Sequence, residues 1–176
     1  YLLVDEVEIG PPVETCARTA KQVRPFGADL LIGVGGGSSL DTAKAVGVLL
    51  DSPEDADPYE VLYRKVTPYE NIKTQCKLNV ICVPTTAGTA SELSPYAVMT
   101  RVDIHTKLAI FPWVYCVAAF LDPRYVETAP DMILHTGVFD ALAHGVESYL
   151  HNNHNRMNRL FAEFGFSLFK DFKDGM

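Results

Sequence analysis

The sequence has no membrane-length apolar run, no excess of positive charge and no closely spaced cysteines. Its longest apolar stretch, residues 108–121, contains Pro112 and is too short to span a bilayer. Lysine and arginine number 15 against 22 aspartates and glutamates, so the net charge is −7, and neither nucleic acid nor a membrane is an expected partner. The four scattered cysteines lack the CxxC spacing of a zinc ribbon. With no secretion signal at the start, we expect reduced thiols and a cytoplasmic location.

The chain of 176 residues is long enough for a domain with its own apolar core. Apolar runs predict strands at residues 28–34, 78–83 and 114–121, and the first run, almost wholly apolar, suits a strand buried on both faces of a parallel sheet. Two extended segments, 96–100 and 107–111, flank a polar connector and predict a hairpin. Helical spacing of apolar residues predicts helices at 13–23, 39–50, 138–150 and 156–172. Residues 51–71, rich in Pro, Asp, Glu and Tyr, predict an exposed excursion.

The order of these elements predicts the fold class. Strands and helices alternate first and helices alone follow, which is typical of an α/β part followed by an all-α part. The boundary falls near residues 128–131. We therefore expect a partial Rossmann-like parallel sheet in residues 1–128 and the first helices of a second domain in residues 129–176.

A glycine-rich segment, Gly35-Gly36-Gly37-Ser38, follows the first of these strands. Glycine lets the backbone approach a ligand closely. Ser38 is a natural N-cap for the next helix, and Asp41 follows it at capping-box spacing. Free N–H groups and the helix dipole make such a helix start a phosphate site. The segment matches neither GxGxxG nor GxxxxGK[ST], so a tight turn without a ligand explains these residues equally well.

A threonine-rich loop, residues 84–92 (PTTAGTASE), follows the strand predicted at 78–83. Ligands of open α/β sheets bind at the carboxyl ends of strands, so this loop and the glycine loop are expected to face each other. Its hydroxyls and bare backbone suit phosphate, ribose or a nicotinamide amide. A polar surface turn without a ligand is an equally good interpretation of the loop alone.

Asp140 and His144 lie four residues apart in a predicted helix, so their side chains share one face. Glu147 and His151 continue that face. Aspartate and histidine are acceptable ligands for Fe²⁺ or Zn²⁺. By spacing alone an ordinary surface pair is the better interpretation, because a catalytic metal normally takes at least three protein ligands.

The segments GGGSSLDTAK (35–44), PTTAGTASE (84–92) and DPRYVETAP…TGVFDALAHGVESY (122–149) together are more specific than each alone. In order and spacing they resemble the signature segments of iron-containing alcohol dehydrogenases. The resemblance makes residues 1–128 the NAD(P)-binding part and residues 129–176 the start of a metal-binding helical part. It implies metal ligation by Asp140 and His144. The cofactor-binding positions that it implies are Gly36, Gly37, Ser38, Asp41, Thr85, Thr86, Thr89 and Lys107.

The resemblance implies hydride transfer between NAD or NADP and a primary alcohol or aldehyde, with Fe²⁺ or Zn²⁺ polarising the substrate oxygen. A homodimer or a higher homo-oligomer is expected. Two alternatives remain at this point. One is an enzyme similar to glycerol dehydrogenase or dehydroquinate synthase, whose loops differ from those quoted. The other is a truncated, non-catalytic nucleotide-binding fragment.

Three features depart from the family pattern. Thr136-Gly137 stands one residue earlier relative to Asp140 than in the family's commonest TGxDA form, although the count from Asp122-Pro123 to Asp140 still fits. Ala90 stands where the family usually has the second glycine of TTAGTGSE. The family's first strand–helix–strand would precede Tyr1, and its two remaining histidine ligands would follow Met176. We therefore expect the 176-residue chain alone to hold little metal and to show no alcohol dehydrogenase activity.

Overall fold

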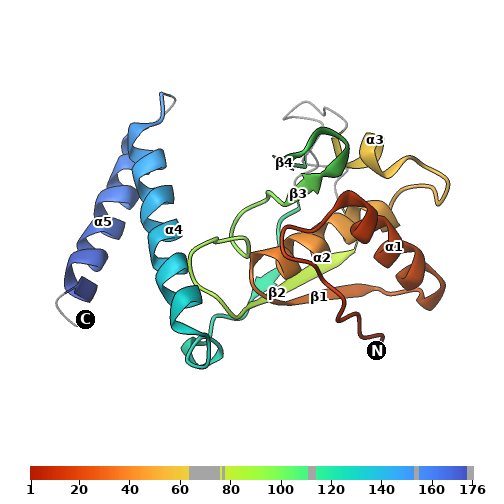
Figure 1. The fold of residues 1–176 in the computed structure, drawn as a ribbon, viewed down its shortest axis with the longest axis horizontal. Helices are drawn as coiled ribbons and strands as arrows, with labels where there is room; N and C mark the ends of the chain where they lie inside the picture. Colours follow the sequence, from red (N-terminus) through yellow and green to blue (C-terminus); the bar gives the residue numbers. More distant parts are fainter. Residues whose placement is uncertain (64–75, 77, 111–113, 153–154, 174–176) are drawn as a thin grey trace.

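The computed structural model describes residues 1–63, 76, 78–110, 114–152 and 155–173, without the side chains of 171–173. Parts of the predicted excursion (64–71) and of a predicted strand (residue 111) lie outside these ranges. Along the chain the main elements are α1 (Val13–Val23), β1 (Leu30–Gly35), α2 (Gly37–Leu50), α3 (Pro58–Tyr63), β2 (Asn79–Pro84), β3 (Val98–Arg101), β4 (Thr106–Ala109), β5 (Ala118–Ala119), α4 (Asp131–Leu150) and α5 (Arg156–Lys173). The order confirms an α/β part followed by helices (Figure 1).

A parallel sheet with the strand order β1-β2-β5 forms the centre of the α/β part. The β1–β2 pairing runs from Leu30 opposite Asn79 to Gly35 opposite Pro84, so both strands end at the same edge. β5 is much shorter than the strand predicted at 114–121, because only Ala118 and Ala119 pair with β2. The carboxyl ends of β1 and β2 therefore bring the two predicted loops together.

One face of the sheet is covered by α2, and α1 packs against α2 in turn. Gly33 in β1 permits close contact, because a Cβ there would lie 3.1 Å from the Cβ of Ala43 in α2. The alternate residues Ile32 and Val34 are 57% and 58% exposed. The prediction that this strand is buried on both faces was therefore wrong, because no helix among the described residues covers the second face.

The predicted hairpin is confirmed by the antiparallel pair β3–β4, in which Thr100 lies opposite Lys107. Its buried residue Met99 contacts the Cys16 thiol of α1, with 3.3 Å between the sulfurs. The Thr100 N–H also donates to the Pro11 carbonyl, 2.9 Å away. These contacts attach the hairpin to the start of α1.

The helices α4 and α5 lie side by side at one end of the molecule (Figure 1). α4 begins at Asp131, seven residues before the predicted start at 138, directly after Pro130. A Cβ on Gly145 would lie 3.0 Å from the Phe166 ring, so this glycine lets the helices approach closely. In the described part of the chain, no helix is both long and apolar enough to cross a membrane.

Candidate cofactor and metal site

The glycine loop lies at the end of β1, but its helix starts earlier than predicted. α2 begins at Gly37 with Gly36 as the N-cap residue, and no side chain caps the helix. The prediction that Ser38 caps this helix was therefore wrong. Ser38 lies in the first turn, where its hydroxyl accepts a hydrogen bond from the Gly10 N–H at 3.0 Å. Glycine is an acceptable N-cap residue, and the free N–H groups of the first turn still lie at the strand end.

Asp41 does not complete a capping box. Its carboxylate instead accepts hydrogen bonds from the Ser91 hydroxyl at 2.6 Å and from the Val98 N–H at 2.9 Å. Burial raises the pKa of Asp41, while the hydrogen bond from Ser91 opposes that shift. One carboxylate oxygen thus binds the end of the threonine-rich loop at Ser91, and the other binds the start of β3 at Val98. Its assignment as a cofactor-binding residue stays a prediction.

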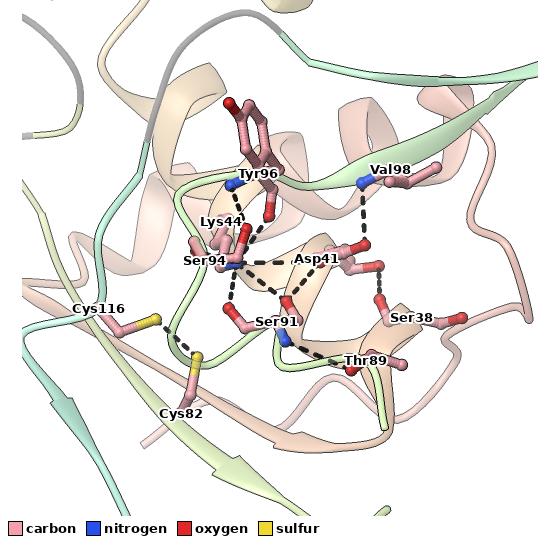
Figure 2. A network of polar contacts seen from close by, with 11 residues as sticks. Ser38, Asp41, Lys44, Cys82, Thr89, Ser91, Ser94, Tyr96, Val98 and Cys116 are labelled. Carbon is pink, nitrogen blue, oxygen red and sulfur yellow. Dashed lines mark hydrogen bonds and ion pairs between the residues drawn. The ribbon is translucent and has the colours of Figure 1, made fainter. Parts of the chain in front are cut away.

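Lys44, which the sequence analysis did not single out, lies at the centre of the same polar network (Figure 2). Its side chain is fully buried, and its Nζ lies 4.0 Å from an Asp41 carboxylate oxygen. Burial lowers the pKa of Lys44, and the negative charge of Asp41 opposes this shift. The three N–H groups of the ammonium share four acceptors, which are the Ser91 hydroxyl (2.9 Å) and the carbonyl oxygens of Ser91, Ser94 (2.9 Å) and Tyr96 (2.8 Å).

The contacts of Asp41 and Lys44 hold one segment of the chain against α2. They fasten residues 91–98 to α2, the helix whose first turn forms the glycine loop. The Asp41–Lys44 spacing of three residues was a signal in the sequence, because such pairs are neighbours on a helix. The burial of a lysine was not foreseeable from that spacing.

The threonine-rich loop faces the glycine loop, as predicted. The Thr85 N–H donates to the Gly35 carbonyl at 2.9 Å. A Cβ on Gly36 would lie 3.2 Å from Thr86 Oγ1, and one on Gly37 would lie 2.9 Å from Thr89 Cγ2. The two loops thus touch at the positions that the resemblance assigns to the cofactor.

Ala90, the departure from the family pattern, has a positive φ of 49°. Residues other than glycine adopt this left-handed conformation at a cost of roughly 1–2 kcal/mol, because the Cβ crowds the following carbonyl. The backbone therefore keeps the shape that glycine favours even though the side chain has changed. The substitution is accommodated with local strain.

Lys107 lies on β4 and is exposed. A Cβ on Gly10 would lie 2.8 Å from the Lys107 Nζ, so the ammonium group lies directly over this glycine. Gly10 also donates to Ser38 in the first turn of α2. The structure thus brings Lys107 to the glycine loop through Gly10, a residue with a φ of +60° that the sequence analysis missed.

The α4 helix reaches the same region through His144. The Nδ1 atom of His144 lies 3.3 Å from the Gly88 carbonyl oxygen. A carbonyl oxygen only accepts, so Nδ1 is the donor in this contact, and in the neutral ring the lone pair then lies on Nε2. A Cβ on Gly137 would lie only 2.2 Å from the Ala87 carbonyl oxygen, so the two backbones are in contact there.

The residues present fit part of a metal site. Asp140 is half-buried and His144 is exposed, and both lie on one face of α4. A histidine that donates its other ring N–H to a carbonyl has the arrangement usual for a metal ligand. Within the described ranges, no group of three or more His, Cys, Asp or Glu side chains is placed to hold a metal ion. The pair supplies two ligands of an incomplete set.

Comparison with known proteins identifies the class. A sequence model of the family described as "Iron-containing alcohol dehydrogenase" matches residues 1–123. The chain is 34% identical over 142 residues to an alcohol dehydrogenase of Thermococcus barophilus, covering 79% of this chain and 36% of the relative. It is 36% identical over 145 residues to an NADPH-dependent aldehyde reductase of Escherichia coli, covering 82% and 36%. The chain belongs to the iron-containing alcohol dehydrogenase family.

Solved structures agree with this assignment. The crystal structure of an iron-containing alcohol dehydrogenase from Thermotoga maritima superimposes with a TM-score of 0.81 at 35% identity, covering 92% of this chain and 42% of that one. An alcohol dehydrogenase from Oenococcus oeni gives a TM-score of 0.80 at 29% identity, covering 92% and 40%. The chain therefore spans well under half of the length of the relatives that it matches.

Proposed function

We propose that this protein carries the NAD(P)-binding half of an enzyme that transfers hydride between the cofactor and a primary alcohol or aldehyde. The observation that supports this most is the meeting of three elements at the carboxyl ends of β1 and β2. These elements are the glycine loop, the threonine-rich loop and the His144 side chain. Open α/β sheets bind ligands at this edge. The names of the relatives, alcohol dehydrogenase and aldehyde reductase, support the same class of reaction.

In this proposal the first turn of α2 binds the cofactor pyrophosphate. Its free N–H groups and positive dipole end suit a phosphate, and Gly36 and Gly37 leave the backbone accessible. The hydroxyls of Thr85, Thr86 and Thr89 hydrogen-bond the cofactor along the facing loop. The Lys107 ammonium, beside Gly10, adds positive charge at the same end of the helix.

Asp140 and His144 would provide a carboxylate oxygen and the imidazole Nε2 to Fe²⁺ or Zn²⁺. When bound, such a metal acts as a Lewis acid on the substrate oxygen. A catalytic metal normally needs at least three protein ligands, and binding weakens when ligands are missing. We therefore expect the 176-residue chain to hold little metal and to show no alcohol dehydrogenase activity.

The test is a fluorescence titration of NADH and NADPH into the wild-type chain and the Gly36→Ala variant. The added methyl group lies beside Thr86 and blocks the close approach of the pyrophosphate. Loss of one charge-assisted hydrogen bond, ~1.5–3 kcal/mol, weakens binding about tenfold or more. Gly165→Ala is the matched control, because nothing lies within 4 Å of a Cβ there. A wild-type chain that binds neither nucleotide, or a Gly36→Ala variant with unchanged affinity, contradicts the proposal.

A further inference from the structure

Two cysteines that are distant in sequence meet beneath the polar network. Cys82 lies in the middle of β2 and is fully buried, whereas Cys116 is half-buried and precedes β5 by two residues. Their sulfur atoms are 2.8 Å apart, although 34 residues separate them along the chain (Figure 2). The proposed cofactor and metal sites use neither thiol.

The other two thiols, of Cys16 and Cys76, have contacts outside this pair. Cys16 is buried with its sulfur 3.3 Å from the Met99 sulfur, and Cys76 donates to the Leu78 carbonyl at 3.1 Å. Burial raises the pKa of both, to about 12 for Cys16 and about 11 for Cys76. They are therefore unreactive at neutral pH, because the thiolate is the nucleophilic form.

The environment of Cys116 favours its thiolate. The hydrogen bond from the Cys82 thiol lowers the pKa of Cys116, and the buried Lys44 ammonium acts in the same direction, against burial and the charges of Glu92 and Asp41. The same hydrogen bond raises the pKa of Cys82. The negative charge thus belongs on the more exposed sulfur of the pair.

We propose that Cys82 and Cys116 form a peroxide-reactive dithiol that closes to an intramolecular disulfide. The Cys116 thiolate attacks one oxygen of hydrogen peroxide, the O–O bond breaks, and hydroxide leaves and is protonated to water. The resulting sulfenic acid is attacked by the Cys82 sulfur. An S–S bond forms as the S–O bond breaks, and the departing hydroxide takes the Cys82 proton as water. Two thiols lose two electrons, and one peroxide becomes two waters.

A disulfide between Cys82 and Cys116 would connect β2 to the segment that leads into β5. Cys82 is two residues from the end of β2, directly before the threonine-rich loop. Cys116 lies on the segment that leads into β5. A disulfide therefore closes a loop that contains the whole segment held by Lys44 and restricts its movement relative to the sheet.

The experiment exposes the full 176-residue chain to a small excess of hydrogen peroxide and then counts thiols after denaturation. All four cysteines start free, so disulfide formation reduces the count from four to two. Peptide mapping without reductant should find the 82–116 cross-link, and dithiothreitol should restore all four thiols. Cys76→Ser, a second half-buried thiol, is the matched control and should still form the bridge.

Cys116→Ser removes the attacking sulfur and should keep its three remaining thiols under the same treatment. Cys82→Ser keeps the attacking sulfur without its partner, so it should give a Cys116 sulfenic acid that dimedone traps. Three results would overturn the proposal. These are a cross-link through Cys16 or Cys76, oxidation of wild-type Cys116 to sulfinic acid while Cys82 stays free, and four free thiols after treatment.

Discussion

Replacing Lys44 with methionine tests the polar network that holds residues 91–98. Methionine keeps much of the length of the side chain but removes the ammonium group. The carbonyl oxygens of Ser91, Ser94 and Tyr96 then lose a donor, and the buried Asp41 carboxylate loses its nearby cation. Removing one partner of a buried ion pair costs ~3–5 kcal/mol. The Asp41 side chain is 13% exposed and keeps its bonds from Ser91 and Val98, so we expect the lower part of this range, about 3 kcal/mol.

The assay is urea unfolding followed by circular dichroism. A domain has ~5–15 kcal/mol of stability, so a loss of this size shifts the midpoint clearly. Lys21→Met is the matched control, because Lys21 is exposed on α1, and it should change stability by less than ~0.5 kcal/mol. In a double-mutant cycle with Asp41→Asn, the two changes should be non-additive by more than ~0.5 kcal/mol. A Lys44→Met loss below ~1 kcal/mol would refute the reasoning.

Three further changes have outcomes that the structure predicts. Ala90→Gly should raise the free energy of unfolding by ~0.5–1 kcal/mol in the same urea assay, because relief of the left-handed strain exceeds the added chain entropy; a loss of stability would contradict the strain. Gly137→Ala should lower the free energy of unfolding in the same urea assay, because its Cβ overlaps the Ala87 carbonyl and forces α4 and the threonine-rich loop apart; an unchanged free energy of unfolding would argue against that contact. In a full-length enzyme, His144→Ala should remove both metal and activity; stoichiometric metal by elemental analysis would exclude His144 as a ligand.

Short sequence patterns correctly predicted the strands and the hairpin, whose formation depends mainly on neighbouring residues. The β1 and β2 strands follow from short apolar runs bounded by glycine and proline, and the β3–β4 hairpin follows from two extended segments around a polar turn. The contact between Gly36 and Thr86 was predictable because parallel strands end at one edge. Each of these inferences needed only a few neighbouring residues.

The features that sequence reasoning missed depend on distant partners. Ser38 has the right residue type for an N-cap, but its hydroxyl is used by Gly10, 28 residues away. Lysine is rarely fully buried, and Lys44 is buried because its acceptors come from a loop about 50 residues later. The apolar run of β1 indicates burial without indicating which face is covered, so the exposure of Ile32 and Val34 was not predictable.

In the proposed function, the glycine loop and the threonine-rich loop bind NAD(P) together. The most direct test is an NMR titration of NADH or NADPH into the ¹⁵N-labelled chain. The largest shift changes should be those of the amides of Gly36, Gly37, Thr86 and Thr89. A cavity of about 260 Å³ at the other end of α2, lined by Arg24, Leu49 and Pro58 among others, offers the contrasting location. Shifts confined to that cavity, with the four loop amides unmoved at saturation, would contradict NAD(P) binding by the two loops.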